Sequence, residues 1–245
     1  MPLRRIISLT GTDALPFLQG LVTNDVLPLG KAPGLVWTAF LSPQGKYLAD
    51  FFVVATGTGL LLDLPETLAD ATLKRLTMYR LRADVQFAPV DLTVIRGLGA
   101  LPPGAFADPR HAALGWRLYG AGSEAPVDWD AIRVAHLIPE AGTELVPDDS
   151  YILEMGFEAL HGVNFKKGCY VGQEVTARMK HKTDLRKGLV QVRVEGAAPV
   201  GTPITAEGRE VGRLCTQSGG LALAWLRLDQ ATGPMQAGAA RVSRL

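Results

Sequence analysis

Cys169 has the residue type and the neighbours that could do chemistry in this sequence. It lies in the run Lys167-Gly168-Cys169-Tyr170-Val171-Gly172-Gln173-Glu174. Gly168 frees the backbone beside the thiol, and Gly172-Gln173-Glu174 can begin a short helix whose positive end faces it. From Lys166 to Gly188 there are seven lysines and arginines against two acids, Glu174 and Asp184. Because nearby cations favour the nucleophilic thiolate, we predict that Cys169 is a reactive, catalytic cysteine; the alternative is a buried cysteine that only packs.

The other cysteine, Cys215, calls for no chemistry. It lies in Gly212-Arg213-Leu214-Cys215-Thr216, where the alternating burial of a strand explains it as a core residue. Two such separated cysteines without a CxxC pair exclude a disulfide framework, a zinc site and an independently held cluster. The four histidines show no metal-ligand spacing with each other or with acids; they are His111, His136, His161 and His181. We therefore predict no resident metal and a reduced, cytoplasmic protein.

The overall composition is that of an ordinary folded protein. The chain has 245 residues, 47% of them hydrophobic, and 25 basic against 24 acidic side chains. This balance gives no indication of a nucleic-acid or acidic-membrane partner. The first ten residues contain too short an apolar run for a secretory signal, and no apolar stretch is long enough to span a bilayer. We expect a soluble protein.

The elements that must position Cys169 follow from periodicity and turn residues. Listed in order they are helix 11–20, strands 35–41 and 48–54 around the turn Ser42-Pro43-Gln44-Gly45, helix 65–80, strands 90–98 and 115–119, helix 128–136, and strands 189–194, 211–216, 221–228 and 239–245. Thr12 or Asp13 is expected to cap the first helix, and Asp128 or Asp130 the third. The predicted fold class is α+β: a first α+β module at 1–84, a second at 85–183 that ends in the Cys169 motif, and a C-terminal β-barrel at 184–245.

Several motifs in order resemble one known family. The run from Lys167 to Glu174 is similar to the Lys-Gly-Cys-(Phe/Tyr)-x-Gly-Gln-Glu signature of the YgfZ family, and Phe17–Asp25, Leu41–Lys46 and Tyr79–Ala83 agree with it in the same order. This family comprises folate-binding relatives of the glycine-cleavage T-protein that serve iron-sulfur enzymes. The resemblance implies an aminomethyltransferase-like (GcvT-like) fold: three modules around a central hole that can hold tetrahydrofolate or a one-carbon derivative.

The same resemblance implies a set of folate contacts. Asn24 falls in the Thr-Asn-Asp turn, and Asp50 falls where T-proteins keep an acid near the reacting carbon of the folate. Arg80 or Arg82 could meet the glutamate tail, with Trp37, Phe40 and Tyr170 as walls. Arg133, Lys167 and Gln173 complete the candidate cofactor-binding residues. Each also has a purely structural interpretation, as turn residues, solvated helix-end charges or core aromatics.

One departure from the T-protein pattern bears on the reaction. T-proteins carry an Arg-x-Glu element whose glutamate contacts the pterin, whereas this sequence has Arg133-Val134-Ala135. In addition, Cys169 stands where T-proteins typically have an aspartate. We therefore predict a tetrahydrofolate-binding factor for assembly or repair of iron-sulfur enzymes, with those enzymes or assembly proteins as partners. Two alternatives stay open: a folate-dependent aminomethyltransferase or demethylase, and a scaffold that binds partner proteins. The sequence does not decide whether the protein is an enzyme.

Overall fold

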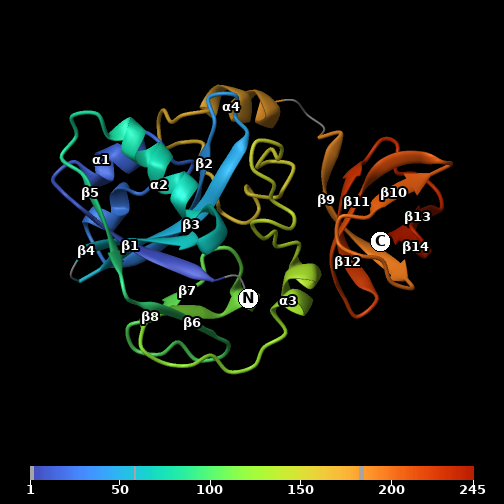
Figure 1. Ribbon diagram of the computed structural model, residues 1–245, viewed down its shortest axis with the longest axis horizontal. Coiled ribbons are helices and arrows are strands. Elements are labelled where there is room, and N and C mark those ends of the chain that lie inside the picture. The colour runs from blue at the N-terminus through green and yellow to red at the C-terminus, as the bar shows by residue number, and fades with distance from the viewer. Residues whose placement is uncertain (1–2, 58, 182–184) are drawn as a thin grey trace.

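The computed structural model describes residues 3–57, 59–181 and 185–245. Figure 1 shows a large α+β body formed by the first half of the chain, a smaller sheet with one helix below it, and a separate barrel formed by the C-terminal residues. The predicted α+β architecture with a C-terminal β-barrel is confirmed. None of the described helices has the length and apolarity needed to cross a membrane.

The first module is a five-stranded antiparallel sheet in the order β2-β3-β4-β1-β5. Its strands are β1 (Arg4–Thr10), β2 (Gly34–Leu41), β3 (Tyr47–Thr56), β4 (Gly59–Pro65) and β5 (Gln86–Val90). Its helices are α1 (Ala14–Gln19), the 3-10 turn η1 (Leu27–Gly30) and α2 (Glu66–Arg80). Since β5 pairs with β1, this sheet extends beyond the predicted first module at 1–84.

Both faces of the first sheet are covered. Every residue of β3 except the last is buried, which explains its nearly continuous apolar sequence. On one face Phe51 and Val53 pack in a core shared with α1 and α2. On the other face Phe52 and Val54 share a core with residues that follow α3, including Phe157. The chain leading to Cys169 is therefore folded back onto the first module.

The second module is smaller. It is a three-stranded sheet in the order β6-β8-β7, followed by α3. The elements are β6 (Thr93–Gly97), β7 (Phe106–Ala107), the 3-10 turn η2 (Ala112–Leu114), β8 (Trp116–Gly120) and α3 (Trp129–His136). Asp128 caps α3 as predicted, because its side chain accepts a hydrogen bond from the backbone N–H of Ala131. Turns then lead to α4 (Gln173–His181), which lies at the top of Figure 1.

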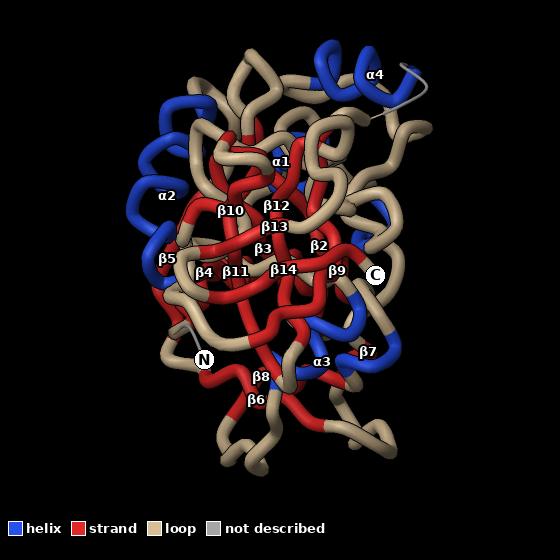
Figure 2. Tube along the Cα trace, turned by 90° about the vertical axis from the view of Figure 1, so that its right-hand side faces the viewer, coloured by secondary structure: helices blue, strands red, loops and turns tan. Residues whose placement is uncertain are grey.

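The C-terminal strands close into a barrel in the order β10-β11-β12-β9-β14-β13. They are β9 (Lys187–Glu195), β10 (Pro203–Ala206), β11 (Arg209–Ser218), β12 (Leu221–Arg227), β13 (Met235–Ala237) and β14 (Ala240–Arg244). Figure 2 looks onto this barrel, with α4 above it and α3 below. The barrel has its own apolar interior and docks on α3, where Gln191 Nε2 donates to the Val134 carbonyl at 2.8 Å.

Most predicted elements are confirmed, and the differences have physical reasons. The first helix is shorter than predicted. Asp13 occupies its N-cap position, but its carboxylate makes no capping bond to the helix and accepts a hydrogen bond from the Asp84 backbone N–H instead. Strands β1, β4, β7, β10 and β13 were not predicted, and β5 overlaps the predicted strand 90–98 only at Val90. Three of them, β7, β10 and β13, are only two, four and three residues long, too short for a clear alternation of burial. The predicted boundary between the second module and the barrel, at 183/184, lies outside the described residues.

Candidate functional site

Cys169 is exposed and Cys215 is buried, as predicted. Gly168 beside Cys169 has φ +96°, a conformation that side-chain-bearing residues rarely adopt, and the space around it is open. Cys215 lies in β11 but faces α3, where it packs with Val134 and Leu223. Burial, helped by nearby Glu144, raises the pKa of Cys215 to about 11. Only Cys169 therefore presents a thiol to solvent among these two.

Lys167 holds the Cys169 loop on the end of α1. Its Nζ donates to the Gln19 carbonyl at 2.6 Å and to the Val22 carbonyl. The first of these carbonyls belongs to the last residue of the helix, where such groups lack an intrahelical partner. Gln19 Nε2 donates back to the Lys167 carbonyl at 3.2 Å. Burial lowers the pKa of Lys167 to about 8, against the opposing effect of Asp25. The cation predicted as a cofactor contact is thus used to fix the loop.

Two glycines lock the other side of the loop to the β2–β3 hairpin. Gly172 has φ +81°, and a Cβ there would lie 2.6 Å from the Ser42 carbonyl oxygen. Gly45, in the predicted turn, has φ +74°, and a Cβ there would lie 2.7 Å from Cβ of Val175 in α4. Side chains at either position would force the hairpin and the loop apart. The two separate glycine motifs of the sequence are therefore two halves of one contact.

Tyr170 and Gln173 shape the turn into α4. Gln173 Oε1 accepts from the Tyr170 backbone N–H at 3.4 Å, and the Gln173 N–H donates to the Tyr170 carbonyl at 3.2 Å. The Tyr170 ring is buried below the Lys167 ammonium, whose Nζ lies 5.0 Å from the ring centroid. Burial raises the pKa of Tyr170, with Thr176 acting in the opposite direction. The predicted short helix does begin at Gln173.

The cationic setting predicted from the residue count is weaker in the structure. Arg178 pairs with Glu174 at 2.6 Å, and Lys180 pairs with Glu158. Lys182 and Asp184, which were part of that count, lie outside the described residues. Counting basic residues along the sequence overestimated the positive charge near the thiol, because Arg178 and Lys180 are paired with glutamates.

Asn24 and Asp50 are bonded within the fold. The amide nitrogen of Asn24 donates to the carbonyls of Trp37 at 2.8 Å and His161 at 2.6 Å. Asp50 is 5% exposed, and its two oxygens accept from Trp37 Nε1 at 2.8 Å and Tyr47 OH at 2.7 Å. Trp37, a predicted folate wall, is fully buried and stacked on Phe157 with ring centroids 4.1 Å apart; Phe40 is also fully buried. Asn24 and Trp37 thus join the first sheet to the 157–164 segment, Asp50 is bonded within the sheet, and Phe40 packs in the core on the opposite face.

The two candidate arginines lie on different parts of the molecule. Arg133 is buried where α3 meets the barrel: it pairs with Glu144, and Glu144 accepts from Thr216 Oγ1 at 2.6 Å. Arg82 is exposed just after α2, and it makes no hydrogen bond or ion pair with the described residues. Ala135 is exposed on α3. The structure thus brings Asn24 and the Cys169 loop to one region but places Arg82 and Arg133 in others.

Sequence reasoning missed a buried ionic network between the two modules. Asp63 of β4 accepts from Arg4 Nε at 2.6 Å and from Arg117 Nη2 at 2.7 Å. Burial alone would raise the pKa of Asp63, but Arg4 and Arg117 together hold it below its ordinary value. Arg110 forms a second pair with Asp108 at 2.7 Å. The partners of Asp63 are more than 50 residues away in sequence, so no spacing in the sequence indicates them.

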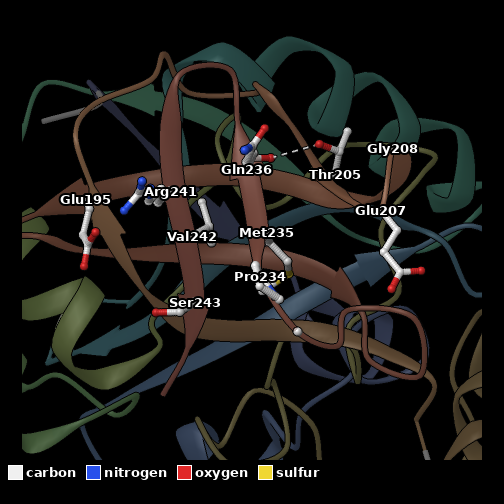
Figure 3. Close-up of a pocket in the computed structure, with 11 residues that line it drawn as sticks. Glu195, Thr205, Glu207, Gly208, Pro234, Met235, Gln236, Arg241, Val242 and Ser243 are labelled. Carbon is white, nitrogen blue, oxygen red and sulfur yellow. Dashed lines mark hydrogen bonds between the residues drawn. The ribbon is translucent and has the colours of Figure 1, made fainter.

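A hollow of about 660 Å³ lies on the outer face of the barrel (Figure 3). A row of side chains from four neighbouring strands crosses it: Glu195, Thr205, Gln236 and Arg241. The residues predicted as the functional site lie elsewhere. Within residues 3–57, 59–181 and 185–245, no group of three or more His, Cys, Asp or Glu side chains is arranged to hold a metal ion.

Comparison with known proteins identifies the family. Residues 186–244 match the family model described as the CAF17 C-terminal beta-barrel domain. The mitochondrial iron-sulfur cluster assembly factor IBA57 of Homo sapiens is 33% identical over 277 residues, which cover 95% of this chain and 78% of that protein. The chain belongs to the IBA57 family. The IBA57 of Mus musculus is 30% identical over 280 residues, with the same two coverages.

Three sequence predictions are decided by these IBA57 relatives and by a solved structure. The resemblance to an iron-sulfur-related family is confirmed at the level of IBA57, whereas the predicted cytoplasmic location is contradicted, since these relatives are named mitochondrial proteins. The glycine cleavage system aminomethyltransferase T from Bartonella henselae superposes with a TM-score of 0.74, covering 98% of this chain and 81% of that one at 13% identity. This likeness confirms the T-protein-like fold.

Proposed function

We propose that this protein acts in the assembly of iron-sulfur clusters and that Cys169 is its reactive thiol. One observation carries the proposal: the exposed cysteine lies on a loop that is fixed on both sides, by Lys167 on the end of α1 and by Gly172 against the β2–β3 hairpin. A thiol held on a rigid support keeps its direction, so it can meet a cluster without first ordering the loop. The names of the IBA57 relatives support the same process.

Cys169 can supply one ligand to a cluster. Iron-sulfur clusters are commonly held by four thiolates, and the described part of this chain offers no group of three or more ligating side chains. Any cluster bound through Cys169 would therefore share its remaining ligands with a partner protein or with a small thiol. This makes the bound cluster a substrate in transit. An acceptor or donor in iron-sulfur assembly is the kind of partner that such chemistry requires.

The sequence resemblance also implies that the protein binds tetrahydrofolate. The side chains predicted to contact this ligand fit it poorly. Both oxygens of Asp50 and both amide hydrogens of Asn24 are already bonded within the fold, and Trp37 is fully buried. Asp50 is only 5% exposed, so a pterin could reach its remaining lone pairs only if the packing around it opened. Ala135 also lacks a carboxylate for the pterin edge. Aminomethyl transfer is therefore the weaker of the proposed functions.

Complementation of a strain that lacks its own homologue tests the proposal. The wild type and Cys215→Ala should restore the activity of a [4Fe-4S] enzyme, and Cys169→Ala should not. Cys169 is exposed, so its replacement is expected to leave the melting temperature unchanged. Full rescue by Cys169→Ala at equal protein level would reject the thiol. Transfer of the aminomethyl group in the presence of the other glycine-cleavage components would favour the alternative function.

A further inference from the structure

The C-terminal half of α2 exposes an unusual amount of apolar surface. The helix buries one face through Ala69, Thr72 and Leu76. On the other side Met78 is 67% exposed and Tyr79 is 39% exposed. A hollow of about 500 Å³ lies between these outer side chains; it is lined by Ala71, Lys74, Arg75, Met78 and Tyr79. The helix therefore has an apolar face that the fold itself does not cover.

Leu81, which ends this helix, has a strained backbone conformation that no contact within the fold explains. Its φ is +46° and its ψ is −105°, a positive-φ conformation outside the left-handed helical region and one that side-chain-bearing residues rarely adopt. A leucine in this conformation suffers a steric clash between its side chain and the backbone. The side chain is nevertheless 88% exposed. Neither the strained backbone nor the exposed side chain of this leucine stabilises the protein by itself. The combination indicates that Leu81 contacts another molecule.

The same surface is basic. From Ala71 to Ala83 the sequence has four basic residues and no acid. Lys74, Arg75 and Arg82 are exposed. Arg75 forms a long ion pair with exposed Asp148 at 3.9 Å, whereas Lys74 and Arg82 have no ion pair with the described residues. The charges of Lys74 and Arg82 are therefore free to meet an external acid.

We propose that the α2 end surface, formed by Lys74, Arg75, Met78, Tyr79, Leu81 and Arg82, binds an acidic segment of a partner protein. An apolar side chain of the partner fills the hollow while its carboxylates meet the basic rim. Methionine and tyrosine suit such a contact because one adapts its shape and the other offers a ring with a polar end. The charge complementarity sets which partner binds and how fast it arrives.

This surface is distinct from the Cys169 site but mechanically joined to it. The Tyr79 ring lies edge-on to Phe40 with centroids 5.9 Å apart. Phe40 forms a bridge with Val22, whose carbonyl accepts from Lys167. A partner held at α2 would thus be bound to the same rigid body that presents the thiol. The inference does not require the thiol chemistry to be correct.

Fluorescence anisotropy with defined peptides tests the proposal. The probe is a labelled amphipathic peptide of about twenty residues with leucines on one face and glutamates on the other, and the control peptide replaces each leucine by serine at equal charge. We expect the leucine peptide to bind at least about tenfold more tightly than the serine peptide and to weaken with salt. Replacing Arg82 by glutamate should weaken binding by about tenfold, whereas Lys166→Glu, an exposed change elsewhere, should not.

Leu81→Gly is the decisive variant because it should weaken peptide binding without lowering the stability of the fold. Glycine accepts the positive φ of this position, so the melting temperature should not fall. Loss of the side chain should weaken peptide binding by about fivefold or more. Leu101→Ser, a change at another exposed leucine, should leave binding unchanged. Cys169→Ala should also leave it unchanged, which separates this inference from the proposed function.

Four results would overturn the inference. Equal binding of the leucine and serine peptides would mean that the peptides bind by charge attraction alone and that the apolar hollow does not contribute. Tighter binding of heparin or of phosphatidylserine vesicles than of the leucine peptide would indicate a nucleic-acid-like or lipid ligand. Self-association of the protein that Leu81→Gly abolishes would mean that a second copy covers the surface. Absence of any peptide binding would remove the docking role.

Discussion

Nζ of Lys167 lies 2.6 Å from the backbone carbonyl oxygen of Gln19, the last residue of α1. This hydrogen bond joins two sequence motifs that are almost 150 residues apart. The positive end of the side chain meets the negative end of a short helix, which is the favourable arrangement for a cation. Lys167 thus fixes the position of the loop that carries Cys169.

Replacing this lysine should loosen the Cys169 loop. Lys167→Met keeps the length of the side chain but loses two charge-assisted hydrogen bonds, so we expect a loss of about 1–3 kcal/mol of unfolding free energy. Amide hydrogen exchange in residues 164–172 should become faster. Lys166→Met, which changes an exposed neighbour, is the control and should alter neither quantity. Unchanged exchange in the Lys167 variant would mean that the loop is held by Gly172 alone.

The two glycines of the motif should differ sharply in their tolerance of alanine. Gly172→Ala meets both a left-handed φ and the Ser42 carbonyl at 2.6 Å, so we expect a loss of about 2–4 kcal/mol. Gly168→Ala meets only the left-handed φ in open space, and a loss of about 1 kcal/mol is expected. Urea unfolding of both variants measures the difference. Equal losses would show that the hairpin moves aside without cost.

The sequence allowed prediction of the elements whose signals are local. The capping residue Asp128 predicted a helix, the turn at Gly45 predicted a hairpin, and the motif around Cys169 predicted an exposed cysteine. It did not reveal the partners of Asp50 or Arg133, because a buried polar side chain is defined by groups that the fold brings in from elsewhere. A resemblance assigned these two to a ligand. The structure shows them engaged with Trp37 and Glu144.

Arg133 should prove important for stability at the contact between α3 and the barrel. Arg133→Met leaves the buried carboxylate of Glu144 without its guanidinium, and we expect a loss of about 3–5 kcal/mol of unfolding free energy. Arg178→Met breaks an exposed pair with Glu174 in α4 and should cost less than about 0.5 kcal/mol. Chemical unfolding measured by tryptophan fluorescence compares the two variants. Similar small losses would indicate that Thr216 and water satisfy Glu144 without the arginine.

The acid limb of the stability curve should depend on Asp63. Arg4 and Arg117 hold its folded pKa below the ordinary value, so its contribution is present at neutral pH and is lost as the pH falls through the folded pKa. Asp63→Asn should be less stable than the wild type at about pH 7 and should lose less stability below about pH 4. Asp229→Asn, at an exposed position, should follow the wild type. Urea midpoints across this range decide it, and parallel curves for Asp63→Asn would contradict the assignment.

The two cysteines should react with iodoacetamide at very different rates. Burial raises the pKa of Cys215 from an ordinary value of 9.0 to about 11, so near neutral pH burial lowers its thiolate fraction about 100-fold. Its position between β11 and α3 also blocks the reagent, while Cys169 is open to solvent. Mass spectrometry of partly alkylated protein should therefore find Cys169 modified at least about 100-fold faster. In concentrated urea the two rates should converge, because both differences depend on the fold. Equal rates in the folded protein would mean that the barrel opens from α3 readily, and a slower Cys169 would leave the motif as a structural turn.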